Sequence, residues 1–188
     1  MATLPNSFDI WTYDNPKEVV PITTAAGDLA TGLTVPGICA GASARWCYKM
    51  LTERDPRESK PEKSVARELQ GLYQGLVKNK SAANLDIRPF FKAARLTAVE
   101  GANPGALDRG DFAATSLKVR DNVGVYWYGP PGHAIGVAKR SDSEYYYFEP
   151  EKGLYRLNDR VKFKNQVGNN FLSKLNSPHW WLVRVTLA

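Results

Sequence analysis

One stretch of the sequence, GICAGASARW at Gly37–Trp46, is the most informative for the fold, because it places a cysteine among small residues where a helix is expected to begin. Apolar or small side chains recur at helical spacing from Ile38 to Leu51, which is the pattern of a helix with one buried face. Before this stretch, residues 1–36 are rich in Pro, Thr, Gly and Asp. They predict an extended N-terminal arm that wraps the core and leads into the helix.

Beyond this helix the sequence pattern changes from helical to extended near Ser116. A second helix is expected from Ser64, a candidate N-cap, to about Asn79, and a third over 87–96 with a proline in its first turn. Residues 100–114 predict a long loop. Period-two patterns then predict strands at 123–128, 134–138, 144–148, 153–157 and 180–187. Helices followed by antiparallel strands indicate an α+β fold, with one domain over 1–188: an arm (1–36), a helical part (37–100) and a sheet (116–188).

Cys39 is the candidate nucleophile. A thiolate is the reactive form of cysteine, and the positive end of a helix dipole stabilises it. The small neighbours Ala40, Gly41 and Ala42 are expected to leave the helix start open to a substrate backbone. The competing interpretation is a small buried residue, which is what most free cysteines are.

His133 is the candidate acid and base for this thiol. It lies in GHAIGV, between a Gly-Pro-Pro-Gly turn and an apolar strand, so its ring is expected at a sheet edge. The competing interpretation is a turn histidine that makes only local hydrogen bonds. The chain has one other histidine, His179. It precedes a strand but no carboxylate ends a following strand, so we interpret it as structural.

Glu149 is the candidate third member of the site. It ends the strand predicted at 144–148, and antiparallel pairing with 134–138 would return it beside His133. A carboxylate there would hold the imidazole in one tautomer and stabilise its charged form. Asp142, in the intervening turn, and Glu151, beyond a proline, are less well placed. The alternative is a solvated carboxylate at a strand end.

Three short segments together resemble the YopT/AvrPphB family of cysteine proteases. GICAGASARW matches the pattern G-[VI]-C-x-G-x-S-x-x-W around the family's nucleophile, and HAIG at 133–136 matches its histidine strand. YFEPEKG at 147–153 stands beside the family's F-[FY]-D-P-N-x-G. The matched residues are few, although the order of elements agrees from Val35 to Leu187.

The resemblance implies a papain-like fold, in which the nucleophile at a helix N-terminus packs on a C-terminal antiparallel sheet. It also implies a hydrolase, a thiol protease with the triad Cys39, His133 and Glu149. By the same resemblance the chain would be a virulence effector or toxin, secreted and acting on a protein in the cytosol of a target cell. The residues alone leave open deamidation of glutamine or asparagine, acyl transfer to an amine, and a catalytically inactive binding module with the same fold.

Two departures from the family pattern bear on the reaction. Glu149 stands where the family has aspartate, so its reach to His133 is one methylene longer. No Asn or Gln lies between Asp28 and Cys39 to stabilise the oxyanion. The Cys39 N–H can supply one donor, but the second donor is unassigned. This gap is the main support for the binding-module alternative.

Composition excludes some classes of function and leaves others open. The formal net charge of +6 is scattered along the chain, which suits acidic partners or an anionic membrane surface. No nucleic acid is expected, because no RNP-type motif or basic stripe is present. The two cysteines and two histidines have no zinc-ligand spacing, so no metal or other cofactor is expected. The oligomeric state is left open.

The cysteines and the N-terminus bear on where the protein acts. Cys47 follows Cys39 by eight residues on one predicted helix, about 12 Å at 1.5 Å per residue, which exceeds the roughly 7 Å limit for a disulfide. We therefore expect free thiols, a reducing site of action, and a core position for Cys47. The first residues lack both a basic start and an apolar segment, so no Sec-type signal peptide is expected.

Overall fold

The computed structural model describes residues 8–13, 18–23, 29–35, 37–77, 86–100, 123–129, 133–161, 163 and 181–188. The elements in chain order are β1 (Phe8–Thr12), β2 (Glu18–Thr23), β3 (Leu29–Val35), α1 (Cys39–Thr52), the 3₁₀ helix η1 (Pro56–Glu58), α2 (Lys63–Val77), α3 (Arg88–Ala93), β4 (Leu96–Glu100), β5 (Gly124–Gly129), β6 (Ile135–Ser141), β7 (Glu144–Glu149), β8 (Gly153–Leu157) and β9 (Trp181–Leu187).

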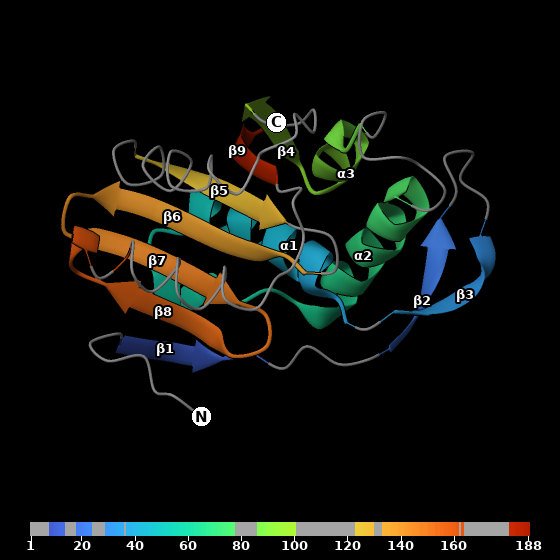
Figure 1. Cartoon of the computed structure of the whole chain (residues 1–188), viewed down its shortest axis with the longest axis horizontal. Coiled ribbons are helices and arrows are strands. Elements are labelled where there is room, and N and C mark those ends of the chain that lie inside the picture. Colours follow the sequence, from blue (N-terminus) through green and yellow to red (C-terminus); the bar gives the residue numbers. More distant parts are fainter. Residues whose placement is uncertain are drawn as a thin grey trace.

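Seven of the strands form one sheet in the order β1-β8-β7-β6-β5-β9-β4, and every neighbouring pair is antiparallel. Helix α1 lies across one face of this sheet, where it contacts β5, β6, β7 and β9 (Figure 1). Helix α2 packs beside α1, and β2, which pairs with β3, packs against α2. None of the described helices is long and apolar enough to cross a membrane.

The contact between α1 and the sheet depends on Trp46 and Gly136. The Trp46 ring is fully buried and stacks on Phe148, with 5.7 Å between ring centroids. A Cβ atom added to Gly136 would lie 2.1 Å from the Trp46 ring. Only a glycine in β6 therefore lets the tryptophan of α1 approach the strand this closely.

The contact between α1 and α2 depends on Gly41 in the same way. A Cβ atom at this position would lie 1.9 Å from the carbonyl oxygen of Ala66 and 2.7 Å from the backbone nitrogen of Gln70. Both obstacles are backbone atoms of α2, so no side-chain movement can relieve the clash. Gly41 thus sets the distance between the two helices.

We expect Gly41→Ala to destabilise the protein by about 3 kcal/mol, because overpacking at a rigid contact forces a backbone shift. Chemical denaturation of both proteins would measure the change. Helix propensity acts in the opposite direction: in an open helical position the same substitution stabilises by about 1 kcal/mol. A more stable Gly41→Ala protein would therefore contradict the close packing of α1 on α2.

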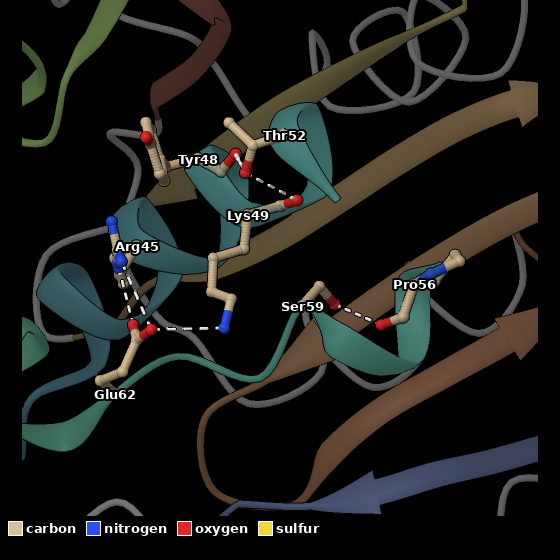
Figure 2. A network of polar contacts seen from close by, with 7 residues as sticks. All are labelled: Arg45, Tyr48, Lys49, Thr52, Pro56, Ser59 and Glu62. Carbon is tan, nitrogen blue, oxygen red and sulfur yellow. Dashed lines mark hydrogen bonds and ion pairs between the residues drawn. The ribbon is translucent and has the colours of Figure 1, made fainter. Parts of the chain in front are cut away.

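A polar network on the outer side of α1 links it to the start of α2 (Figure 2). The Glu62 carboxylate accepts from Arg45 at 2.7 Å and from Lys49 at 3.3 Å. The hydrogen bond from Arg45 is the main reason that the pKa of Glu62 falls to about 2. Because the Glu62 side chain is 44% exposed, the network contributes little net stability. The Thr52 and Ser59 hydroxyls donate to backbone carbonyls of their own preceding turns (Figure 2).

Helix boundaries differ from the sequence prediction in two places. Helix α2 begins at Lys63, and the Ala66 N–H donates to the carbonyl of Glu62 at 3.0 Å, so Ser64 lies inside the helix and is not its N-cap. Helix α3 ends at Ala93 instead of continuing to residue 96. Arg95 adopts a left-handed conformation with a φ of 59°, which ends the helix.

The sheet also receives two strands from outside residues 116–188. Strand β4, which follows α3, pairs with β9 at one edge, and β1 pairs with β8 at the other. The sequence pattern places β1 in the N-terminal arm and β4 in the helical part, so both assignments to the sheet are corrections. The five strands predicted downstream all form, with only small shifts of their ends. The loop predicted at 100–114 lies outside the described residues from position 101 onward.

Candidate active site

Cys39 is the first residue of α1 and is partly exposed. Gly37 has a φ of 151°, a conformation that glycine adopts far more readily than other residues, and the chain enters the helix two residues later. Cys47, which follows Cys39 by eight residues in α1, is fully buried, and its burial raises the pKa of its thiol. Both cysteines are free, which confirms the expectation that they form no disulfide and that Cys47 belongs to the core.

The pairing of β6 with β7 brings His133 and Glu149 together. The strands pair with Gly136 opposite Phe148. His133 comes just before β6 and Glu149 is the last residue of β7, so both lie at the same end of the pair. The strand geometry expected from the sequence is confirmed.

The Glu149 carboxylate is held from several sides. Its Oε1 atom lies 2.7 Å from His133 Nε2, within the 2.6–3.2 Å expected for an orienting carboxylate. The Tyr147 hydroxyl donates to Oε2 at 2.8 Å, and the Glu151 N–H approaches Oε1 at 3.4 Å. Both side chains of the pair are largely buried, with 16% of His133 and 10% of Glu149 exposed. Glu149 is therefore not a solvated strand-end carboxylate.

His133 is poised between Glu149 and Cys39. Burial of the ring by itself lowers the pKa of His133, but hydrogen bonds with Cys39 and Glu149 and the charges of both groups outweigh it and raise the pKa to about 10. Since Nε2 faces Glu149, Nδ1 is the ring nitrogen left for Cys39. The His133 ring is thus favoured as an imidazolium at neutral pH.

The contact with His133 shifts the pKa of Glu149 in the opposite direction. Burial alone would raise the pKa of its carboxyl, but the hydrogen bond and the charge of His133 outweigh burial and lower the pKa. Tyr147 is fully buried against this carboxylate, and burial raises the pKa of its hydroxyl, with the Glu149 charge adding to the effect. Tyr147 therefore stays protonated and donates to Glu149.

The structure thus brings Cys39, His133 and Glu149 together, and neither competing carboxylate, Asp142 or Glu151, takes the place of Glu149 beside His133. The Asp142 side chain is 96% exposed and lies 2.7 Å from Lys139. Glu151 is exposed and contributes only its backbone N–H. The interpretation of His179 as a structural residue lies outside the described residues. Among the described residues, no group of three or more His, Cys, Asp or Glu side chains could hold a metal ion.

The small residues after Cys39 have a different role from the one expected. Ala40 is 1% exposed and Ala42 is fully buried, while Gly41 faces the backbone of α2. These residues therefore do not open the helix start to a substrate. They allow α2 and the sheet to pack closely around the first turn of α1, because larger side chains would push these elements away.

Two polar residues of the site were not identified from the sequence. Tyr147 lies two residues before Glu149 in β7, and the period of two places both on one side of the strand. Gln70 sits on the buried face of α2, and its carbonyl oxygen accepts from the N–H groups of Ala40 and Gly41. A glutamine among apolar residues on a helix face indicates a buried hydrogen-bond partner, but the sequence does not say which one.

We expect Glu149→Gln to lower the rate of any reaction that uses this site by about 10²- to 10⁴-fold. A small alkylating reagent should still label Cys39, and Glu149→Asp should retain more activity because it keeps the charge. Glu149→Gln should also change how both the reaction rate and the stability depend on pH. The native pKa of His133, about 10, lies above its unfolded value of about 6.5. Protonation of His133 therefore contributes stability that is fully present below about pH 6.5 and is lost as the pH rises through about 10, whereas the contribution of Glu149, whose pKa is lowered, is lost at acid pH.

Because Glu149 is one cause of the raised pKa of His133, Glu149→Gln should move the alkaline limb of the rate profile to lower pH. Rates measured between about pH 5 and 11 for both proteins would show the shift. An alkaline limb at the same pH in both proteins would show that Glu149 does not act on His133.

The fold and the arrangement of these residues define a class: an α+β papain-like fold with a cysteine at the start of the helix that crosses the sheet. Among solved structures, the chain is similar to the Pseudomonas avirulence protein AvrPphB, with a TM-score of 0.55 and 16% identity over 80% of this chain and 92% of that chain. This similarity confirms the fold that the sequence resemblance implied.

A cysteine protease-like domain of the Photorhabdus asymbiotica toxin PaTox also matches, with a TM-score of 0.43 and 10% identity over 80% of this chain and 48% of that one. No protein-family model and no curated protein sequence matches the chain.

Proposed function

We propose that this protein is an effector-type cysteine protease that hydrolyses an amide bond in a protein of a target cell. The observation that carries the proposal is the placement of one imidazole between a helix-start cysteine and a buried carboxylate. The avirulence protein with the similar fold supports the effector setting. Delivery from the producing cell into the cytosol of another cell is part of the proposal.

The proposed reaction uses Cys39, His133 and Glu149 in two steps. The Cys39 thiolate attacks the amide carbonyl carbon, and the C=O electron pair moves to oxygen. As the tetrahedral intermediate collapses, the C–N bond breaks and His133 gives its proton to the leaving nitrogen. Water then attacks the thioester carbon, His133 takes a proton from it, and the C–S bond breaks to release the acid and the thiolate. Glu149 orients the ring throughout and stabilises its charged form.

Incubation of the protein with extracts of candidate target cells, followed by mass spectrometry, tests this proposal. A protease produces new protein termini with the wild type and none with Cys39→Ala. A gain of about one dalton without a new terminus would assign deamidation of a glutamine or asparagine side chain instead, and addition of an amine would assign acyl transfer.

A thiol-reactive epoxide of the E-64 type separates these enzymes from a binding module. An enzyme that uses this site should be labelled at Cys39 in the wild type and much more slowly in His133→Ala. Equal labelling of the two proteins, with no change in any substrate mass, would indicate a binding module with a papain-like fold.

A further inference from the structure

The first turn of α1 is held by a side chain from another helix. The Gln70 carbonyl oxygen accepts from the Ala40 N–H at 2.9 Å and from the Gly41 N–H at 3.1 Å, and the residue is only 2% exposed. Since both partners are donors, the oxygen of the amide must face them. Gln70 therefore satisfies two of the N–H groups that an α-helix leaves without partners at its N-terminus.

Two more contacts hold the same turn. The ring N–H of Trp127, on β5, donates to the Ala40 carbonyl at 3.2 Å. The absence of a side chain at Gly41 lets α2 approach, since a Cβ there would lie 2.7 Å from the backbone nitrogen of Gln70. The close approach of the helices is thus what allows the short glutamine side chain to reach the backbone of α1.

These contacts distinguish the Cys39 N–H from the other N–H groups of this turn. The Ala42 N–H donates to the carbonyl of Ile38 at 2.8 Å, and those of Ala40 and Gly41 donate to Gln70. No described residue accepts from the Cys39 N–H. This donor belongs to the candidate nucleophile itself, where attack on a carbonyl would create negative charge on oxygen.

We propose that Gln70 is a positioning residue for this site. By accepting from Ala40 and Gly41 it fixes the first turn of α1, so that the Cys39 N–H stays directed at the oxygen of the tetrahedral intermediate. The inference rests on the proposed function, because it assigns Gln70 to the same reaction. A neutral acceptor suits this role, since it holds the N–H groups without placing a formal negative charge beside the Cys39 thiolate.

Two variants and two electrophiles test the proposal. Gln70→Met keeps the length of the side chain but removes the acceptor, while Gln70→Glu keeps an acceptor oxygen. A peptide aldehyde reacts with the thiolate at a carbonyl carbon and places charge on oxygen, whereas iodoacetamide is displaced at a saturated carbon and creates no oxyanion. The ratio of the two rate constants therefore reports the oxyanion donor, and any change in thiolate population cancels from it.

We expect Gln70→Met to lower the ratio of aldehyde to iodoacetamide reactivity by about tenfold or more, and Gln70→Glu to lower it less, because glutamate keeps the acceptor oxygen although its charge opposes the oxyanion. A wild-type ratio in Gln70→Met would overturn the proposal. A loss in Gln70→Glu as large as in Gln70→Met would overturn it too, because the acceptor oxygen would then not matter. If instead the wild type shows no His133-dependent labelling, the proposed function itself fails.

Amide hydrogen exchange of the wild type gives a second test that needs no variant to fold. The Ala40 and Gly41 amides should exchange slowly, because Gln70 accepts from both, and the Cys39 amide should exchange faster than either. Exchange of all three amides at the same rate would show that Gln70 does not hold the Ala40 and Gly41 N–H groups more firmly than that of Cys39. This result would overturn the proposal without bearing on the function of Cys39.

Discussion

Replacing Cys39 by alanine is expected to abolish activity, with a loss on the order of 10³-fold or more, while leaving the fold intact. The residue is partly exposed at the start of α1, beside His133, so the substitution removes the proposed nucleophile without opening a cavity in the core. Peptide hydrolysis, or release of product from the physiological substrate, would measure the loss. Thermal unfolding would show whether the fold remains.

Cys47→Ala is the matched control, because it removes the other thiol of the same helix. Cys47 is fully buried, so its loss should lower stability by about 1–2 kcal/mol through a small cavity and leave the rate per folded molecule unchanged. A Cys39→Ala protein that is folded and as active as the wild type would refute the enzyme assignment, whatever the control shows.

The second large effect is expected at His133. His133→Ala should inactivate to a similar degree, about 10³-fold or more, because members of a catalytic group act as a unit. In the proposed reaction the imidazole both stabilises the thiolate and supplies the proton for the leaving group, so alkylation of Cys39 at neutral pH should slow as well. Iodoacetamide labelling followed by intact-mass measurement separates the first effect from the second.

His179→Ala provides the comparison for His133, since these are the two histidines of the chain. The sequence prediction assigns His179 a structural role, so this variant should label and react like the wild type once corrected for the folded fraction. Loss of labelling in His179→Ala, with normal labelling in His133→Ala, would exchange the two assignments.

The central parts of the fold were predictable because each has a strong local pattern. Strands β5 to β8 are short runs rich in aromatic and other apolar residues and are joined by short connections, so their antiparallel order follows from proximity in the chain. The approach of Glu149 to His133 follows from that pairing. Strands β1 and β4 were missed because each joins the sheet at an edge, far in sequence from the partner that stabilises it, and no local pattern encodes such a partner.

The roles of residues in the first turn of α1 could not be predicted for a similar reason. Gly41 and Gln70 lie 29 residues apart, and neither residue alone indicates a contact with the other. The sequence shows a small residue near a cysteine, which is equally consistent with substrate access and with helix packing. Only the position of α2 decides between them, and that position depends on the packing of the whole domain.

Arg140 has a consequence for the spacing of the site. This residue of β6 donates to the carbonyls of Met50, Glu53 and Arg54 at the far end of α1, at 3.2, 3.0 and 2.8 Å. The strand and the helix are therefore joined at one end by Arg140 and meet at the other through His133 and Cys39. From His133 to Arg140 the chain spans about 23 Å at 3.3 Å per residue, and α1 from Cys39 to Glu53 spans about 21 Å at 1.5 Å per residue.

The two elements have matched lengths between these two contacts. The Cys39 sulfur and the His133 imidazole therefore lie side by side only while α1 and β6 keep their present numbers of residues. A substitution along either element changes its packing, but an inserted or deleted residue changes its length and would carry one reacting group past the other. Side chains along α1 and β6 can therefore vary more freely in this protein than the number of residues in each element.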